Sequence, residues 1–538
     1  MLDFLSASES WELDDEDKEA RAALVRASCR LDFELFADLF FPHYVKHNYN
    51  DFHRDMFEYY SLPKRAARLA RGAPRGYAKS TLTALIKPIH DACYGFEKYI
   101  LIASNGQPLA NGKLKDIRTE ILGNTQLVDV YGIRFPRKNP AETEFTTICD
   151  GHKTAFKAVG TGVQVRGTRV GADRPTKIIL DDVEHSEEVE NEEIRVKYEN
   201  WYNEDICKVG DETTNIEFIG TVLHKEALLS KLLVNPAYNG KIYKAVISFA
   251  KNEQLWQKWR DLYTNLDNPT RADTALAFFK QNEAAMMEGV HVLWPEKEPY
   301  YNLMVEIIEN GRRAFMKEKQ QEPLASDSRV FENFHWYHEV DGGILIEKSG
   351  KIIKWDELKS HAYGVIDPAT GKKKSKSLGD FSCLLSGFKE PQGRLLVHND
   401  WTRREPPTKY MRQIFDSHDH YNYQKFGVEE NLYRELLIPN LADERKRREE
   451  RGGKIIKLAF YGIDQTANKI ERITAIEPKV SHGWILLNRA LSPEFKSQLE
   501  NFPSSSHDDC PDALEMLWNL VNGRYKPSPL SISAQAGR

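Results

Sequence analysis

Short apolar runs alternate with segments of helical spacing through the first part of the chain. The clearest runs are KYILIAS (98–104), KIILDD (177–182) and IEFIGTVLH (216–224), each bounded by polar residues. Continuous apolar runs of this length are typical of strands buried on both faces of a parallel sheet. With helical spacing between them, they predict an α/β fold with a mainly parallel sheet. Residues 13–41 have helical spacing throughout and predict a helical lead-in.

The second half restarts with strand patterns. These are HAYGVIDPA (361–369), FSCLLSGFKEPQGRLLVHNDW (381–401) and KFGVEE (425–430), and the middle one predicts a hairpin that turns at Pro391–Gly393. Periodicity is lost around residues 318–334, where Pro and Ser gather, which indicates a domain boundary. We therefore expect five segments, namely a lead-in (1–48), a first α/β domain (49–325), a linker (326–355), a second domain (356–523) and a flexible tail (524–538).

Length and composition narrow the class of protein. The chain has 538 residues, of which 41% are hydrophobic and 29% charged, so we expect a soluble protein with more than one core. The net charge of -5 means that any contact with nucleic acid must come from local basic patches. Six cysteines without a CxxC pair argue against a zinc site or a disulfide framework and favour a reducing cytoplasm. We find no export signal and no run long enough to span a bilayer.

The segment GAPRGYAKST (72–81) has the chemistry of a phosphate-binding loop. It departs from the pattern G-x-x-x-x-G-K-[ST], because Ala73 and Ala78 occupy the two glycine positions. The residues expected to bind ATP in this loop are Arg75, Gly76, Lys79, Ser80 and Thr81. Gly76 permits a tight backbone, Lys79 can reach the β and γ phosphates, and Ser80 can ligate Mg²⁺. The alternative is a basic loop that leads into a core helix.

KIILDDVE supplies the acidic partner of this loop. Asp181 would hold the Mg²⁺-bound water, and either Asp182 or Glu184 would orient the water that attacks the γ-phosphate. A strand end with solvated acids is the alternative. Since the acids follow a Lys-Ser loop at a domain-scale separation, an NTPase is the better interpretation.

Three further residues complete the expected nucleotide site. Arg166 or Arg169, in VRGTRVGADRP, would serve as an arginine finger, and an exposed basic loop is the alternative for each. Thr221, after the run IEFIG, would sense the γ-phosphate at the carboxyl edge of the sheet. A buried threonine satisfied by backbone groups is the alternative for that position.

Carboxylates lie at three separated element ends in the second half. The candidates for metal ligands are Asp367, Glu429, Glu430, Asp508, Asp509 and Asp512. Carboxylates are the ligands that Mg²⁺ or Mn²⁺ prefers, and two such ions can stabilise both oxygens of an in-line phosphodiester displacement. Asp508 and Asp509 have the alternative of capping the helix that follows. For Asp380 we favour a turn residue over a residue that supports the metal ligands.

Basic segments are the candidates for DNA contact. The best is the loop Lys372–Lys376, because it lies close to Asp367 in sequence. Lys469 and Arg472 are further candidates. The run ERKRREERGGK (444–454) carries many acids as well, so we expect a solvated helix face there.

From about residue 50 to about residue 520, the chain resembles the large terminase subunits of tailed bacteriophages. The resemblance rests on the order of six motifs, namely RGYAKST, IILDDVE, IGTVLH, VIDPATG, GVEEN and HDDCPDAL. The resemblance implies a P-loop ATPase domain of the ASCE type followed by an RNase H-like nuclease domain. It implies that Arg75 and Lys79 bind phosphates, that Asp181 binds Mg²⁺ and that Thr221 is the coupling residue. It implies a nuclease site made of Asp367, Glu429 and Asp508, with Glu430 and Asp509 as adjacent alternatives. One departure is Asp182, which stands where the family usually has a catalytic glutamate.

The function expected from the resemblance is ATP-driven translocation of double-stranded DNA into a procapsid, with cutting by a divalent-metal-dependent endonuclease. The resemblance also implies ATP and Mg²⁺ as cofactors, with Mg²⁺ or Mn²⁺ at the nuclease site. The implied partners are double-stranded DNA, the portal protein of the procapsid, a small terminase subunit and further copies of the chain in a ring. The implied location is the host cell cytoplasm, transiently on the procapsid and not in a membrane. The alternatives are a helicase-like DNA-remodelling ATPase without nuclease activity and a non-enzymatic scaffold.

Overall fold

The computed structural model describes residues 15–136, 141–324, 329–358, 361–368, 381–405, 407–429, 444, 446–448, 450, 458, 460–463, 468–523 and 525. The chain divides into two compact units. Unit 1 consists of Met1–Lys251, Met287–Ile307 and Arg312–Ala325, and unit 2 consists of Asn252–Met286, Ile308–Gly311 and Ser326–Arg538. Each unit therefore draws on segments that are discontinuous in sequence.

Within the described residues, unit 1 is built on a seven-stranded sheet in the order β3-β4-β2-β5-β6-β1-β7. The strands are β1 (Arg68–Gly72), β2 (Tyr99–Ser104), β3 (Glu144–Cys149), β4 (His152–Gly160), β5 (Lys177–Asp181), β6 (Asn215–Gly220) and β7 (Asn239–Ile242). Neighbouring strands are parallel except for β3 and β4. The three apolar runs form β2, β5 and β6, which are buried along their whole length, so the predicted mainly parallel α/β sheet is confirmed.

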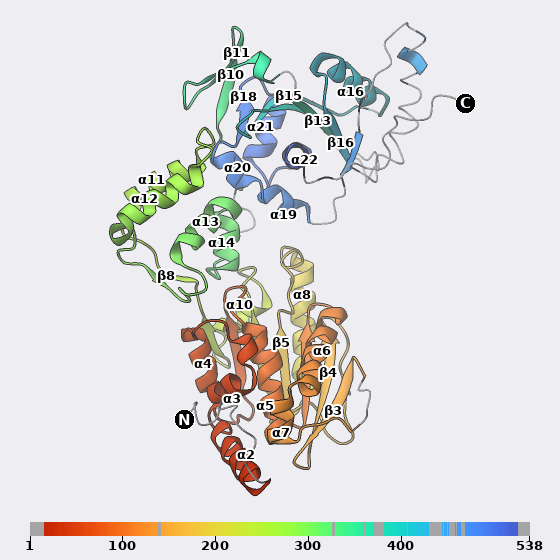
Figure 1. The fold of residues 1–538 in the computed structure, drawn as a ribbon. Helices are drawn as coiled ribbons and strands as arrows, with labels where there is room; N and C mark the ends of the chain where they lie inside the picture. Colours follow the sequence, from red (N-terminus) through yellow and green to blue (C-terminus); the bar gives the residue numbers. More distant parts are fainter. Residues whose placement is uncertain are drawn as a thin grey trace, which may run out of the picture. The chain divides into compact units, whose positions relative to one another are not determined.

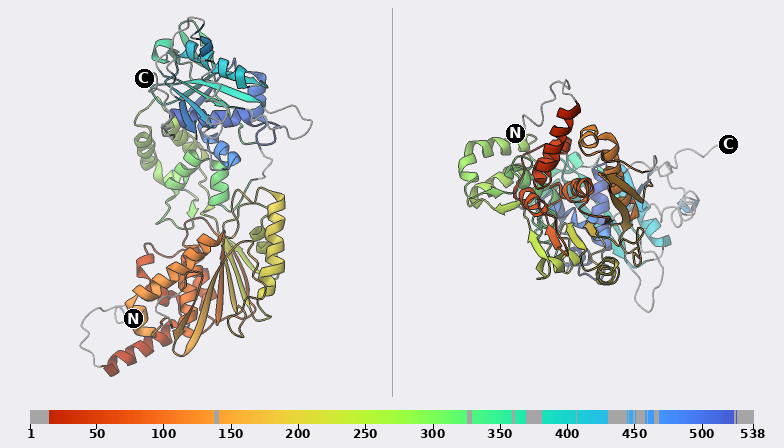
Figure 2. Two further views of the ribbon diagram at one scale, coloured as in Figure 1. Left: turned by 90° about the vertical axis from the view of Figure 1, so that its right-hand side faces the viewer. Right: turned by 90° about the horizontal axis from the view of Figure 1, so that it is seen from below.

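Helices lie on both sides of this sheet (Figures 1 and 2). The helices before residue 250 are α2 (Asp15–Cys29), α3 (Phe33–Phe40), α4 (Asp51–Tyr60), α5 (Lys87–Tyr94), α6 (Gln107–Gly123), α7 (Thr125–Tyr131), α8 (Glu192–Trp201), α9 (Cys207–Val209) and α10 (Leu228–Val234), with shorter or wider turns at η1 (Pro42–Tyr44), η2 (Thr81–Ile86) and η3 (Tyr202–Ile206). The predicted lead-in forms α2 and α3. Asp32 caps α3 by accepting a hydrogen bond from the backbone N–H of Leu35 at 2.9 Å.

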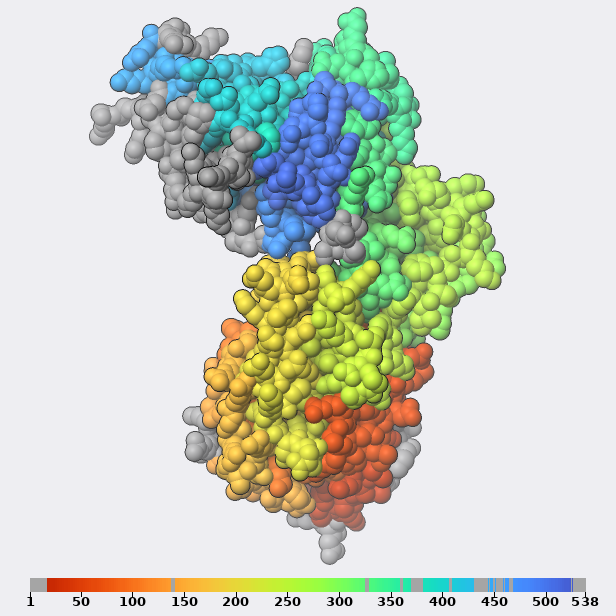
Figure 3. All heavy atoms as spheres, turned by 180° about the vertical axis from the view of Figure 1, so that it is seen from behind, coloured from red at the N-terminus to blue at the C-terminus, as the bar shows by residue number. Residues whose placement is uncertain are grey.

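Helix α4 packs onto the sheet edge that ends in β7. Figure 3 shows the N-terminal residues, in red, against the segment near residue 240, in yellow-green. Lys241 of β7 donates to Asp55 of α4 at 3.0 Å, and β7 pairs in parallel with β1. Helix α4 therefore lies beside the sheet edge next to β1, the strand that leads into the phosphate loop.

Unit 2 holds a nine-stranded sheet within the described residues, in the order β12-β11-β10-β18-β15-β14-β13-β16-β17. The strands are β10 (Trp336–Val340), β11 (Gly343–Ile346), β12 (Ile352–Lys354), β13 (Ala362–Asp367), β14 (Ser382–Lys389), β15 (Leu395–Arg403), β16 (Lys425–Glu429), β17 (Phe460–Ile463) and β18 (Ile485–Asn488). β13, β14 and β15 run antiparallel, whereas β16 continues the sheet in parallel beside β13. β14 and β15 form the predicted hairpin, with Glu390 accepting a hydrogen bond from the N–H of Gly393 at 2.8 Å in its turn.

The remaining helices are α11 (Glu253–Thr264), α12 (Arg271–Met286), α13 (Tyr300–Asn310), α14 (Arg312–Glu318), α15 (Trp355–Leu358), α16 (Pro407–Tyr421), α19 (Lys469–Thr474), α20 (Glu477–Ser481), α21 (Pro493–Glu500) and α22 (Asp509–Val521), and β8 (Val246–Ser248) pairs with β9 (His291–Val292). None of the described helices is long and apolar enough to cross a membrane.

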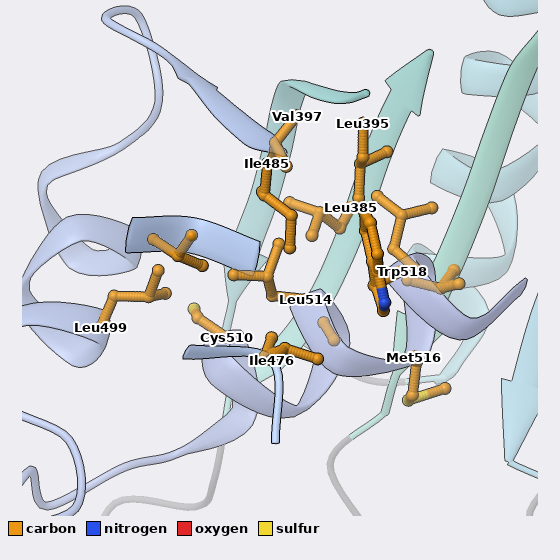
Figure 4. Close-up of a cluster of buried hydrophobic side chains, with 14 of the residues drawn as sticks. Leu385, Leu395, Val397, Ile476, Ile485, Leu499, Cys510, Leu514, Met516 and Trp518 are labelled. Carbon is orange, nitrogen blue, oxygen red and sulfur yellow. The ribbon is translucent and has the colours of Figure 1, made fainter. Parts of the chain in front are cut away.

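Helix α22 is the centre of the core of unit 2. All its residues are buried, including the acids of its first turn. Figure 4 shows Leu514 and Trp518 of this helix among Leu385 and Leu395 of the sheet. Burial of one leucine contributes about 1.5–3 kcal/mol, so this packing fixes the helix and holds its acidic start at the end of the sheet.

Candidate active sites

The segment between β1 and η2 forms a tight loop at the carboxyl end of the sheet. Gly76 has φ +84° and Ala78 has φ +57°. Ala78 occupies the second glycine position of the phosphate-loop pattern, and it adopts the left-handed conformation that a glycine usually supplies. For an L-residue this conformation costs about 1–2 kcal/mol. Alanine thus keeps the left-handed turn at this position although the pattern's glycine is absent.

Lys79 ties this loop to the end of β6. Its Nζ donates to the carbonyl oxygens of Ala73 at 2.9 Å and Pro74 at 3.2 Å, and to Thr221 Oγ1 at 3.1 Å. Burial lowers the pKa of the Lys79 ammonium. The Thr221 hydroxyl therefore accepts a hydrogen bond from a side-chain cation, and it lies within reach of any phosphate that Lys79 contacts.

Ser80 and Asp181 meet at the start of the helix that follows the loop. Ser80 Oγ donates to Asp181 Oδ1 at 2.8 Å, and Asp181 is fully buried at the end of β5. The ammonium of Lys113, on α6, lies 2.5 Å from Asp181 Oδ2. A hydroxyl beside a carboxylate whose charge is balanced by a cation is a donor set that fits Mg²⁺. Lys113 was not predicted, because nothing distinguishes it from the other polar residues of α6.

Asp182 and Glu184 have different surroundings. Asp182 lines the cavity in front of the phosphate loop and adopts φ +47°. Burial of its carboxyl among protein atoms raises the pKa of Asp182, although the side chain also reaches solvent. Glu184 is buried and accepts hydrogen bonds from the backbone N–H groups of Leu228 at 2.7 Å and Leu229 at 3.0 Å. Glu184 thus occupies the start of α10, a short helix without a side-chain cap of its own.

Of the three arginines predicted for the nucleotide site, one lines the cavity and two do not. Arg75 lines the cavity, and its Nε lies 3.2 Å from Glu318 Oε2. Arg166 is paired with Glu204 at 2.8 Å and Asp205 at 3.1 Å, and Arg169 is exposed. Neither Arg166 nor Arg169 is among the described residues that line the cavity.

The cavity in front of the loop has a volume of about 530 Å³. Besides Arg75, Gly76, Lys79, Ser80, Thr81 and Asp182, its lining includes Tyr44, Lys46, His47, Tyr49, His53, Trp294 and Lys297. The aromatic side chains come from FPHYVKHNYNDFH and from the segment before α13, and the sequence pattern predicted neither. An apolar and aromatic wall beside a cationic loop matches a ligand with a flat ring and an anionic tail.

His53 links the aromatic wall to the loop. Its Nδ1 accepts from the backbone N–H of Asn50 at 3.2 Å, and its Nε2 donates to the carbonyl of Tyr77 at 3.0 Å. Burial lowers the pKa of His53 to about 4, so the ring is neutral near pH 7. Its two bonds connect the start of α4 to the phosphate loop.

The carboxylates of the second half gather at one end of the sheet in unit 2. Asp367 ends β13 and Glu429 ends β16, and these strands are parallel neighbours with Ile366 opposite Val428. Asp508 and Asp512 lie at the start of α22. Burial and the neighbouring carboxylates raise the pKa of Asp367 and of Glu429. The structure therefore brings together acids from three separated segments.

Lys469, at the start of α19, lies among these acids. Its Nζ is 2.8 Å from Asp508 Oδ1, 3.2 Å from Asp512 Oδ2 and 3.9 Å from Asp367 Oδ2. Arg472, one turn later, contacts Asp512 Oδ1 at 3.1 Å. Both cations were predicted as DNA contacts, and in the structure both balance the carboxylates.

The capping alternative for Asp508 is excluded. Asp508 is the N-cap residue of α22, but its side chain makes no capping hydrogen bond. Asp509 begins the helix and is buried. Among the described residues as they stand, no group of three or more His, Cys, Asp or Glu side chains is arranged to hold a metal ion. The carboxylate oxygens are nevertheless ligands that suit Mg²⁺ or Mn²⁺. In this structure the Lys469 ammonium occupies the space between three of these carboxylates, where a metal ion would otherwise balance their charge. Glu430, Asp380, Lys372–Lys376 and most of the run 444–454 lie outside the described residues.

Comparison with known proteins found matches to solved structures but none from the sequence. No protein-family model matches the sequence, and no curated protein matches it. The large terminase of a thermophilic bacteriophage is 9% identical with a TM-score of 0.40, over 88% of this chain and 100% of that one. The bacteriophage HK97 large terminase is 11% identical with a TM-score of 0.30, over 93% and 99%. The human cytomegalovirus terminase nuclease domain is 14% identical with a TM-score of 0.25, over 32% and 90%. Over 88% to 93% of its length, the chain is thus similar in structure to large terminases of bacteriophages.

Proposed function

We propose that this chain is an ATP-driven translocase of double-stranded DNA joined to a divalent-metal-dependent DNA endonuclease, of the large terminase type. The observation that carries the proposal is the junction of Ser80 with Asp181 at 2.8 Å beside Lys79 and Thr221. A hydroxyl, a carboxylate and an ammonium converge there at a helix start, which is the constellation that phosphoryl transfer needs.

Unit 1 would hydrolyse ATP to ADP and phosphate. Lys79 and Arg75 would bind the phosphates, and Ser80 and Asp181 would hold Mg²⁺, which neutralises charge on the β and γ oxygens. Asp182 is our choice for the residue that orients the attacking water, because it lines the cavity while Glu184 is bonded to the start of α10. The aromatic wall would hold the base.

The ATPase site would be completed by an arginine finger from a second copy of the chain. Arg169 is exposed and Arg166 is paired with acids of its own unit, so Arg169 is the better candidate for a finger that reaches a neighbouring subunit. This assignment presupposes a ring of subunits.

Unit 2 would cut DNA. Asp367, Glu429 and Asp508 would hold Mg²⁺ or Mn²⁺, with Asp509, Asp512 and Glu430 as adjacent ligands. The metal would supply Lewis-acid stabilisation of the attacking and leaving oxygens of the phosphodiester. The acids of α22 are held rigidly by the packing of that helix, which favours precise placement of the ligands.

The proposal also specifies where the protein acts and with which partners. It would act in the host cell cytoplasm, assembled as a ring on the portal protein of a procapsid, with a small terminase subunit that selects the DNA. No membrane is involved in this scheme.

Reciprocal variants of the full-length protein test the two activities. Lys79→Met should abolish ATP turnover and leave Mn²⁺-dependent cleavage of plasmid DNA intact, whereas Asp367→Asn should do the reverse. The matched controls Lys251→Met and Asp341→Asn carry exposed residues of the same types. Cleavage that survives Asp367→Asn would favour the helicase-like alternative. Absence of ATP turnover by the unmodified protein, with DNA present, would refute the motor.

A further inference from the structure

A second lysine reaches the phosphate loop from a distant segment. Lys297 lies between β9 and α13, and its Nζ donates a hydrogen bond to the carbonyl of Gly76 across 221 residues of sequence. Its ammonium also lies 4.8 Å from the ring centroid of Trp294 and 5.8 Å from that of Tyr77. The side chain is therefore directed into the cavity, and no expectation from the sequence included it.

The backbone that carries Lys297 is held in place. Trp294 Nε1 donates to the carbonyl of Asn48 at 2.7 Å. The backbone N–H of Glu298 donates to the carbonyl of Trp294 at 2.9 Å, and the Glu298 carboxylate pairs with Lys319. A fixed backbone with a flexible four-carbon stem lets the ammonium change its acceptor without moving the loop.

Lys297 and Lys79 hold different parts of the phosphate loop. Lys79 bonds the carbonyls of Ala73 and Pro74 at the beginning of the loop, whereas Lys297 bonds Gly76 in its middle. Lys79 and the Mg²⁺ held by Ser80 and Asp181 would lie at the β and γ phosphates. Lys297 lines the same cavity as Lys79 and Ser80, so its ammonium is available to the terminal phosphate there.

The present partner of Lys297 is a weak one. A backbone carbonyl is a neutral acceptor, whereas a phosphate oxygen carries negative charge and attracts the ammonium more strongly. Arg75, the neighbouring cation, is already engaged with Glu318. A terminal phosphate in the cavity would therefore draw Lys297 away from Gly76.

We propose that Lys297 is a phosphate-binding catalytic residue that contacts the terminal phosphate of a bound nucleoside triphosphate from within the same subunit. The inference rests on the proposed ATPase function of unit 1. As water attacks the γ-phosphorus and the bond to the ADP oxygen breaks, the ammonium stabilises charge on the γ oxygens. It supplies in cis the charge that neither Arg166 nor Arg169 supplies from its own subunit's cavity.

Nucleotide binding to the full-length protein tests this inference. Affinities for Mg²⁺-ADP and Mg²⁺-ATPγS are measured for the unmodified protein, Lys297→Met, Lys297→Arg and the control Lys251→Met, together with ATP turnover. We expect Lys297→Met to bind ADP within about twofold of the unmodified protein and ATPγS about tenfold more weakly. ATP turnover should fall about a hundredfold. Lys297→Arg should restore most of the ATPγS affinity, and Lys251→Met should match the unmodified protein.

The two nucleotides separate this inference from its alternatives. An equal loss of ADP and ATPγS affinity would place Lys297 at the base or the inner phosphates and overturn the inference. Unchanged affinities and turnover in Lys297→Met would overturn it as well, while leaving the ATPase proposal in place. If the unmodified protein binds neither nucleotide, the proposed ATPase function fails and the inference falls with it. Lys297→Gln repeats the test with a second uncharged side chain. Melting temperatures equal to that of the unmodified protein show that Lys297→Met and Lys297→Gln are folded.

Discussion

Ser80 Oγ lies 2.8 Å from Asp181 Oδ1, and this hydrogen bond joins two segments that are 101 residues apart. Because Asp181 is fully buried, its carboxylate needs partners, and Ser80 and Lys113 provide them. A buried carboxylate that is held by a hydroxyl and an ammonium is already arranged for a divalent ion to enter.

The two acids after β5 should respond differently to neutralisation. Asp182→Asn keeps a residue type that tolerates the left-handed backbone, so we expect an unchanged melting temperature and a loss of ATP turnover of about a hundredfold or more. Glu184→Gln removes one of two acceptors for the N–H groups of Leu228 and Leu229, so we expect destabilisation by about 1–3 kcal/mol with turnover retained in the folded fraction. Thermal unfolding and ATPase assays on both variants measure this. The reverse assignment of the two phenotypes would make Glu184 the residue that orients water.

Acid should destabilise unit 1 through His53. The pKa of this buried histidine is lowered from 6.5 to about 4, with burial as the main cause and Lys297 as a further one. Between pH 6.5 and 4 the unfolded chain binds a proton that the folded chain refuses, so stability falls as the pH falls. The full difference corresponds to about 3 kcal/mol.

The variant His53→Gln isolates this contribution. It cannot titrate, so urea unfolding should show it less stable than the unmodified protein near neutral pH, with the gap closing toward pH 4. Protonation would also set a new N–H against the N–H of Asn50, which now donates to Nδ1. A stability gap that stays constant across this range would show that His53 does not carry the effect.

Divalent metal should compensate for the loss of Lys469. In Lys469→Met the half-exposed Asp508 carboxylate loses a cation at 2.8 Å and the buried Asp512 carboxylate loses one at 3.2 Å. Buried Asp512 then keeps Arg472 at 3.1 Å, so its charge is less well balanced. Without metal we expect a lower melting temperature than for the unmodified protein or the exposed control Lys348→Met. Millimolar Mg²⁺ should raise the melting temperature of Lys469→Met more than that of the unmodified protein. Equal shifts in all three proteins would contradict a metal site at these acids.

Restoring a glycine should relax the phosphate loop. Ala78 adopts φ +57°, so Ala78→Gly removes steric strain of about 1–2 kcal/mol, less the extra conformational entropy of glycine in the unfolded chain. We expect a net stabilisation of about 0.5–1 kcal/mol with ATP turnover retained. Urea unfolding of Ala78→Gly beside the unmodified protein gives the sign, and a destabilised variant would mean that the alanine methyl group packs favourably.

The sequence pattern predicted the sheets better than it predicted their surroundings. Continuous apolar runs identify β2, β5 and β6 because strands buried on both faces tolerate few polar residues. The ends of strands are equally readable, and Asp181 and Asp367 were found in this way. Nothing in the pattern indicated that Asn252–Met286 packs with unit 2, since helical spacing shows that a face is buried but does not identify what buries it.

Contacts across long sequence separations account for the missed site residues. Lys113, His53 and Lys297 carry no local motif, and only the folded chain places them beside Asp181 or the phosphate loop. For the same reason the sequence left Asp182 and Glu184 equivalent. Their difference arises because the backbone N–H groups at the start of α10 meet one of them and not the other.

The single ammonium of Lys79 now serves Thr221 and two backbone carbonyls at once. When an anion draws that ammonium away, the buried Thr221 hydroxyl loses its donor, at a cost of about 1–3 kcal/mol unless a new partner appears. Under the proposed function we therefore expect Thr221 to exchange its hydrogen-bond partner when a nucleotide fills the loop. Occupancy of the loop would then change the hydrogen bonding at the end of β6, a neighbouring strand of the same sheet.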